Sequence, residues 1–216
     1  MARVKTAILI SGRGSNMVAL ISATRAEDYP AEIALVVSND PDAAGLDYAK
    51  ANDIPTAVVN HRNYDSREAF EADLSVVLKA AGTEIVCLAG FMRLLTDTFV
   101  DEWRNRLINI HPSLLPAFKG LNTHARALAA GVRIHGATVH FVRPNMDEGP
   151  IIVQAAVPVM AGDTDPTLAD RVLSVEHQIY PMALSWVASQ RARIVGERVV
   201  LDNDQKTGHT LIVPQL

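Results

Sequence analysis

Residues 6–16 read Thr6-Ala7-Ile8-Leu9-Ile10-Ser11-Gly12-Arg13-Gly14-Ser15-Asn16. A short apolar run followed by a glycine-rich turn is typical of a buried strand that passes into a helix, here from about Met17. Helical patterns separate this strand from four further apolar runs, at 32–37, 54–59, 84–88 and 107–110. Apolar strands that alternate with helices favour a parallel sheet covered on both faces. The sequence therefore predicts an α/β fold with a doubly wound, mostly parallel sheet.

The clearest helical pattern spans 65–81, where apolar residues recur on one face. Asp65 followed by Glu68 predicts a capped start, and Gly82 predicts the end. Beyond Pro116 we expect a helix at 122–130 and an antiparallel extension of the sheet at 137–142 and 151–157.

The last part of the chain predicts one more helix and an edge strand. Asp165 is expected to cap the helix, Pro166 to occupy its first position, and Pro181 to kink it. An edge strand at 198–201 and a loosely specified tail follow. No repeat or linker interrupts the chain, so we expect one domain over 1–216, with a Rossmann-like half over 1–110, a second half over 111–200 and a tail over 201–216.

Composition narrows the classes of function. The 216 residues carry a formal net charge of −4 and no basic block, which argues against nucleic-acid binding. No stretch is long and apolar enough to predict a membrane span, and we expect a cytoplasmic protein. The single cysteine, Cys87, lies in an apolar run and is expected to be buried and unreactive. The histidines show no metal-ligand spacing, so we expect no metal.

Three polar residues predict a reactive site. Asn109 and His111 end an apolar run, and residues two apart in a strand project to the same side. The carboxyl ends of strands in open α/β sheets are where ligands bind. Asp147 lies in a Gly/Pro-rich turn and is able to fold back onto His111. Taken singly, the histidine and the aspartate are as well explained as a satisfied strand-end histidine and a turn aspartate.

The glycine turn predicts an anion site. Backbone N–H groups at a helix start, together with Ser15 and Asn16, suit a phosphate. Two alternatives remain open. Gly12 and Gly14 match the first glycines of a dinucleotide-binding fingerprint, but its third position is Met17, and Asn39 or Asp40 would have to replace the ribose-binding acid. The other alternative is a turn needed only for close packing.

Several ordered motifs resemble phosphoribosylglycinamide formyltransferase, the folate-dependent enzyme of purine synthesis. They span nearly the whole chain and are found at 10–16, 88–93, 109–116, 136–142, 147–152 and 176–181. The resemblance implies the formyltransferase fold. It also implies transfer of the formyl group of 10-formyltetrahydrofolate, the co-substrate, to the amine of glycinamide ribonucleotide. Small molecules would be the partners, and the chain is expected to be a monomer or a weak homodimer.

The family's mechanism would be direct attack without a covalent enzyme intermediate. Asn109 and a protonated His111 would donate hydrogen bonds to the oxyanion. Asp147 would favour the imidazolium, fix the ring and relay protons. Thr138 and His140 share a strand face. They are expected to contact the catalytic residues and not to take part in the reaction themselves.

The resemblance also assigns the binding residues. Gly14, Ser15 and Asn16 would hold the ribonucleotide phosphate, and Glu176 would receive the substrate amine. The folate pocket would be lined by four further residues, Arg67, Arg93, Leu94 and Leu95. Without the resemblance, Arg67 is an ordinary helix-surface arginine and Glu176 an ordinary exposed glutamate.

Two relatives and one further class stay as alternatives. Methionyl-tRNA formyltransferases carry an additional C-terminal domain. Formyltetrahydrofolate hydrolases carry an N-terminal regulatory domain and a second histidine at the position of Pro112. The third alternative is a domain that binds nucleotide or folate without catalysis, although such a domain would not need an oxyanion donor beside an acid. Arg13 and 143–146 vary in the family, and the match is poor after about Val195.

Overall fold

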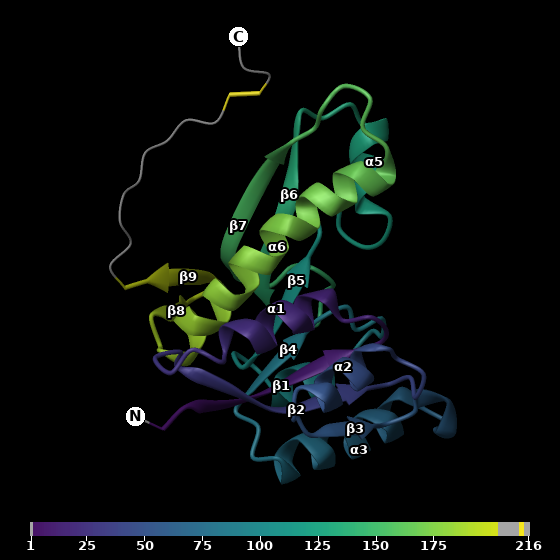
Figure 1. Cartoon of the computed structure of the whole chain (residues 1–216), viewed down its shortest axis with the longest axis vertical. Helices are drawn as coiled ribbons and strands as arrows, with labels where there is room; N and C mark the ends of the chain where they lie inside the picture. The colour runs from purple at the N-terminus through teal and green to yellow at the C-terminus, as the bar shows by residue number, and fades with distance from the viewer. Residues whose placement is uncertain (1, 203–211, 214–216) are drawn as a thin grey trace.

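The computed structural model describes residues 2–202 and 212–213, so the expected tail lies largely outside the described residues. A seven-stranded sheet in the order β3-β2-β1-β4-β5-β6-β7 runs through the molecule (Figure 1). Its strands are β1 (Val4–Ile10), β2 (Ala31–Ser38), β3 (Thr56–Val58), β4 (Ile85–Leu88), β5 (Leu107–His111), β6 (Ile134–Phe141) and β7 (Ile151–Pro158). The five strands from β3 to β5 are parallel, whereas β6 and β7 are antiparallel to their neighbours. The mostly parallel, doubly wound sheet with an antiparallel extension is thus confirmed.

Helices cover both faces of this sheet. The helices are α1 (Ser15–Ala23), α2 (Gly45–Ala51), α3 (Arg67–Ala80), α4 (Asp97–Glu102), α5 (Thr123–Ala129) and α6 (Asp165–Ala188), with a 3₁₀ turn, η1, at His61–Asn63. One apolar cluster joins the sheet to α1, α2, α5 and α6. A second cluster joins the other face to α3 and α4. Strands apolar on both sides are explained by this double cover.

Several expected boundaries were wrong, each for a local reason. The cap of α3 is Ser66, whose side chain accepts a hydrogen bond from the Ala69 N–H, and not Asp65. The cap of α6 is Thr164, so Asp165 is already helical, and the helix continues through Pro181 to Ala188. The strand at 198–201 exists as β9 (Arg198–Leu201), but it pairs with β8 (Ala192–Val195) in a separate hairpin. The outer strand of the main sheet on this side is β7.

The strand order places a ligand-binding crevice at the carboxyl ends of β1 and β4. The chain winds from β1 outward to β3 and then returns to β4 on the other side of β1. In doubly wound sheets, such a reversal of strand order opens a crevice between the two loops. Here the loops stay in contact, because the Ser11 N–H donates to Gly90 O over 3.2 Å.

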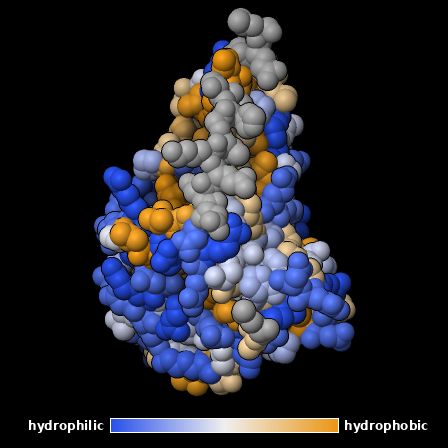
Figure 2. All heavy atoms as spheres, turned by 90° about the vertical axis from the view of Figure 1, so that its left-hand side faces the viewer, coloured by the Kyte–Doolittle hydropathy of each residue, from blue (hydrophilic) through white to orange (hydrophobic). Residues whose placement is uncertain are grey.

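Exposed apolar residues lie on the face of the molecule that carries the last strands. Figure 2 shows the face with the β7 edge and the β8–β9 hairpin, where orange apolar areas lie among blue polar ones. Ile151, Val195 and Val200 are among the exposed apolar residues of these elements. Within the described residues, none of the helices combines the length and the apolar character that crossing a membrane would need.

Candidate active site

The site lies where β5 extends beyond β4. The last residue of β4, Leu88, pairs with Asn109, so β5 continues for two residues without that neighbour. His111 ends β5 and pairs on its other side with Thr138 of β6. The strand end therefore presents side chains at an open part of the sheet edge.

Asp147 reaches this strand end from the 142–150 loop between β6 and β7. Its φ of 57° is left-handed, a conformation that aspartate adopts more readily than most residues. Gly149 lets the loop close, because a Cβ there would lie 1.6 Å from Phe141 O. A hydrogen bond of 2.9 Å from the Phe141 N–H to Pro150 O joins the two strand ends.

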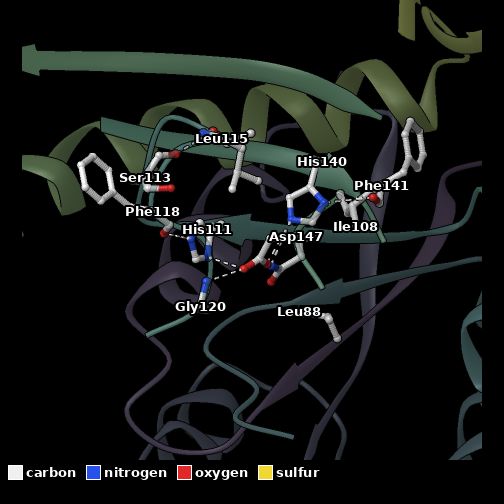
Figure 3. A network of polar contacts seen from close by, with 12 residues as sticks. Leu88, Ile108, His111, Ser113, Leu115, Phe118, Gly120, His140, Phe141 and Asp147 are labelled. Atoms are coloured by element: carbon white, nitrogen blue, oxygen red, sulfur yellow. Dashed lines mark hydrogen bonds and ion pairs between the residues drawn. The ribbon is translucent and has the colours of Figure 1, made fainter. Parts of the chain in front are cut away.

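The Asp147 carboxylate is the meeting point of the site (Figure 3). Its Oδ2 lies 3.6 Å from His111 Nδ1 and accepts a hydrogen bond of 2.9 Å from the Gly120 N–H. Its Oδ1 lies 3.9 Å from His140 Nε2. The side chain is 9% exposed, so this negative charge is held in a largely buried place. A buried carboxylate requires such donors and cationic partners.

The partners of His111 determine which nitrogen faces the cleft. Nε2 lies 3.0 Å from Phe118 O, a carbonyl that can only accept, so Nε2 carries a hydrogen. Nδ1 faces the Asp147 carboxylate at 3.6 Å, which is longer than a hydrogen bond. The Nε2–H of His111 is therefore engaged by a carbonyl, whereas Nδ1 faces the carboxylate without a short hydrogen bond.

His140 orients the side-chain amide of Asn109. Its Nδ1 lies 3.0 Å from Phe141 O, so this nitrogen carries the hydrogen. Burial lowers the pKa of His140, and the ring is neutral at physiological pH. Nε2 is then an acceptor for the Asn109 amide nitrogen, 3.3 Å away. This contact fixes the amide and leaves its second N–H available.

Thr138 and Gln154 hold the segment that follows His111. The Thr138 hydroxyl donates to Ser113 O over 2.7 Å and accepts from the Leu115 N–H over 3.0 Å. The Gln154 amide donates to both Thr138 Oγ1 and Leu115 O, each over 2.9 Å. Thr138 and Gln154 face each other across β6 and β7. This clamp fixes the turn that carries Phe118 O back to His111.

A hollow of about 250 Å³ adjoins the glycine turn, between the ends of β1 and β4. It is lined by Ser11, Gly12, Arg13, Gly14, Ser15, Asn16, Ala89, Gly90 and Met92. Ser15 and Asn16 belong to the first turn of α1, earlier than the expected helix start. The free backbone N–H groups and dipole of a helix start favour an anion here.

Gly45 is a residue of this region that the sequence did not reveal. Its N–H donates to Gly12 O over 3.1 Å. A Cβ at Gly45 would lie 2.6 Å from the Ile10 side chain. The start of α2 therefore supports the glycine turn by a backbone approach that only glycine permits.

Glu176 is buried, unlike the ordinary exposed glutamate that it would be without the resemblance. It is 6% exposed on α6, and its Oε2 accepts a hydrogen bond of 2.6 Å from the Asn16 amide. Burial raises the pKa of Glu176, whereas Asn16 opposes that shift. Asn16 Oδ1 has no hydrogen-bond partner within the described residues. A buried acid and a buried amide thus meet beside the hollow, which a cationic group would satisfy.

The four predicted folate residues lie on two neighbouring segments. Arg67 begins α3 and is exposed, and Arg93 and Leu94 are exposed after β4. Leu95 is partly buried against the α3–α4 cluster. The two segments are joined because Glu71 of α3 accepts hydrogen bonds from the N–H and hydroxyl of Thr96. Within the described residues, neither Arg67 nor Arg93 makes a hydrogen bond or an ion pair with Asn109, His111 or Asp147.

Other reactive groups do not contribute to this site. Burial raises the pKa of the Cys87 thiol to about 12, so the thiol stays protonated. Over 2–202 and 212–213, no group of three or more His, Cys, Asp or Glu is arranged to hold a metal ion.

Sequence reasoning missed the backbone partners of the site, Phe118 O and Gly120 N–H. No residue type marks such groups, although the positive φ of both residues shows how the turn presents them.

Known proteins are similar to this chain over most of its length. Residues 4–184 match the sequence profile of the formyl transferase family. The chain is 42% identical to the phosphoribosylglycinamide formyltransferase of Escherichia coli, over 92% of this chain and 93% of that protein. It is similar to the crystal structure of glycinamide ribonucleotide transformylase 1 from Symbiobacterium toebii, with a TM-score of 0.90 and 45% identity, covering 92% and 94% of the two chains.

A longer relative is the trifunctional purine biosynthetic protein adenosine-3 of Bos taurus. The two sequences are 51% identical over 89% of this chain, but the match spans only 19% of that protein. The likeness therefore concerns one part of the trifunctional protein.

Proposed function

This chain belongs to the phosphoribosylglycinamide formyltransferase family, and from that premise we propose that it transfers the formyl group of 10-formyltetrahydrofolate to the amine of glycinamide ribonucleotide. The products are formylglycinamide ribonucleotide and tetrahydrofolate. The observation that carries the proposal is that His111 and His140 both face the buried Asp147 carboxylate, while His140 also holds the Asn109 amide.

The chemistry is a direct attack of the acceptor amine on the formyl carbon. A C–N bond forms and the formyl oxygen takes up negative charge. Two donors are available to that oxygen, the His111 Nδ1–H and the second N–H of Asn109, because their other N–H groups are engaged by Phe118 O and His140. Removing one such donor typically costs about 3 kcal/mol. The intermediate then collapses as the bond from the formyl carbon to folate N10 breaks.

Proton transfer completes the reaction. The attacking nitrogen must lose a proton and N10 must gain one. Asp147, directly or through a water that it holds, is the group assigned to this relay. The same carboxylate is the negative partner of the imidazolium of His111. No side chain needs to act as a nucleophile.

The two substrates would approach the three proposed catalytic residues from different sides. The ribonucleotide phosphate would lie on the glycine turn at Gly14, Ser15 and Asn16, and its glycinamide amine would meet Glu176. The co-substrate would use the four residues after β4 and at the start of α3, which are Arg67, Arg93, Leu94 and Leu95. Exposed apolar side chains such as Leu94 suit a flat pterin ring.

One assay tests the proposed function. Purified protein is incubated with 10-formyltetrahydrofolate in the presence and absence of glycinamide ribonucleotide, and release of tetrahydrofolate is followed. We expect release that depends on the acceptor. Release of tetrahydrofolate without the acceptor would instead indicate a hydrolase. If no tetrahydrofolate were released with or without the acceptor, the chain would be a binding domain.

His111→Ala tests the catalytic assignment. We expect the variant to lose about 10²-fold or more in kcat, because an oxyanion donor and the partner of Asp147 are both removed. Circular dichroism and thermal unfolding should show that it folds. A variant that turned over like the parent would refute the role of His111.

A further inference from the structure

Two loops meet over the catalytic carboxylate. The ammonium nitrogen of Lys119, in the 118–122 loop, lies 2.6 Å from Oε1 of Glu148 in the 142–150 loop. The next residue of the first loop, Gly120, donates to the preceding residue of the second, Asp147, over 2.9 Å. Successive residues of the two loops are thus paired in antiparallel order, and the ion pair adjoins the hydrogen bond that holds the carboxylate.

We propose that the Lys119–Glu148 ion pair is a positioning device that sets the place of the Asp147 carboxylate relative to His111. Neither residue touches the reacting atoms in this assignment, so both act through Asp147. The inference rests on the proposed function, because the role that it assigns belongs to the same active site.

Each loop is fixed at its far side, so the ion pair joins two anchored segments. Arg126 of α5 donates to Lys119 O over 2.5 Å, and Phe118 O holds the His111 ring. In the other loop, the Arg143 guanidinium is bound by Asn105 over 3.0 Å and by Glu197 over 3.5 Å. Breaking the ion pair would leave these anchors in place and change only the position of one loop relative to the other.

Between these anchors, few contacts fix Asp147. Within the part of the chain that the structure describes, its side chain accepts one hydrogen bond, from Gly120. Its distances to His111 and His140 are 3.6 Å and 3.9 Å, both longer than hydrogen bonds. The backbone contact inside the loop, from the Glu148 N–H to Asn145 O, is long at 3.3 Å. A carboxylate held this loosely depends on the neighbouring residue for its place.

The ion pair is suited to act on position rather than on global stability. The hydrogen bond from Lys119 lowers the pKa of Glu148, which favours the ionised carboxylate. Their side chains are 33% and 46% exposed, and exposed ion pairs contribute little to unfolding free energy. Catalytic groups, in contrast, lose rate steeply with displacements of about 1 Å. A positioning role is therefore separable from a structural one.

The test compares Lys119→Met and Glu148→Gln with the parent. We expect each variant to lower kcat about tenfold, with KM for both substrates and the melting temperature unchanged. The double variant should be no slower than either single variant, and the exchange Lys119→Glu with Glu148→Lys should recover most of the activity. Lys50→Met is the matched control, because it removes an exposed ion pair, with Asp47 at 3.8 Å, outside both loops.

Three results would overturn the proposal. They are single variants that turn over like the parent, losses that add in the double variant, and a melting temperature that falls in step with activity. A raised KM for the folate co-substrate in Lys119→Met alone would also overturn it, because Lys119 would then bind that substrate directly.

A second readout separates this proposal from the proposed function. The ¹H–¹⁵N resonance of the Gly120 amide reports on its hydrogen bond to Asp147 and needs no substrate. We expect it to shift in Glu148→Gln, which leaves the sequence neighbours of Gly120 unchanged, and to stay in place in Lys50→Met. If the parent failed to transfer formyl groups while this shift occurred, the function would be wrong and the positioning right. An unmoved resonance in Glu148→Gln would refute the positioning whatever the activity.

Discussion

His111 Nε2 faces Phe118 O, whereas Nδ1 faces the Asp147 carboxylate. A substitution of Asp147 therefore tests the contact at Nδ1 and leaves the contact at Nε2 in place. Asp147→Asn keeps an acceptor for the Gly120 N–H but removes the negative partner of the imidazolium and the proton relay. We expect kcat to fall about 10²- to 10³-fold with normal unfolding. Steady-state kinetics and thermal unfolding measure both, and Asp47→Asn, an 87% exposed aspartate, is the control. A kcat within about threefold of the parent would remove Asp147 from the mechanism.

His135 makes stability depend on pH. It is 1% exposed, with the His124 ring 5.3 Å away, and burial followed by this neighbour lowers its pKa from 6.5 to about 4. Between these values the unfolded chain binds a proton that the folded chain does not. The stabilising neutral form is therefore fully present above pH 6.5 and lost as the pH falls toward 4, by up to about 3 kcal/mol.

The variant His135→Gln measures this contribution. Urea midpoints at pH 7 and pH 5 should differ less in the variant than in the parent, because residue 135 no longer takes up a proton on unfolding. A smaller difference should remain, since burial also lowers the pKa of His124, His140 and His177. Equal differences in the two proteins would contradict the assignment to His135.

Residue-scale prediction worked where side chains carry the information. Alternation along a strand predicted that Asn109 and His111 share one side, and the turn composition drew attention to Asp147, which lies 3.6 Å from His111. Their catalytic roles remain predictions. Phe118 O and Gly120 N–H escaped prediction because every residue has such groups, and only the positive φ at both positions turns them toward the site. The burial of Glu176 could not be predicted from the residue alone, because it depends on the packing of α6 against α1.

At the scale of elements, the connection from β6 to β7 depends on Gly149. A Cβ at this position would lie 1.6 Å from Phe141 O, so Gly149→Ala must move backbone. We expect a loss of about 2 kcal/mol or more in unfolding free energy, together with a fall in kcat as the 142–150 loop shifts. Gly12→Ala is the control for stability, because a Cβ there meets nothing within 4 Å. Equal urea midpoints for the two variants would contradict the prediction.

Strongly patterned elements were predicted, and so was the seven-residue α5, but two other short helices were not. The helix expected at 65–81 is α3, which begins after its Ser66 cap. In contrast, α2 and α4 have 7 and 6 residues, too few for an apolar repeat to be distinct. The strand β8 was missed, and its pairing with β9 was not predicted, because pairing of a short hairpin depends on packing that local sequence does not encode.

At the scale of the whole molecule, a single chain is expected to be sufficient for activity. The glycine turn, the three proposed catalytic residues Asn109, His111 and Asp147, Glu176 and the four proposed folate residues all come from one chain. We therefore predict that specific activity does not change with protein concentration. Dilution assays combined with sedimentation velocity check this, and activity that appeared only with a dimer would contradict it.

The outermost strand has prolines at both of its ends. β7 hydrogen-bonds to β6, and within the described residues no other strand of the sheet pairs with its opposite rim. The Pro150 carbonyl accepts from the Phe141 N–H and so faces β6. Pro158, in contrast, precedes Val159, whose N–H donates to Arg133 O, and therefore faces the opposite rim. Because proline has no N–H, an incoming strand would lack a donor at Pro158, which disfavours growth of the sheet at that end of β7.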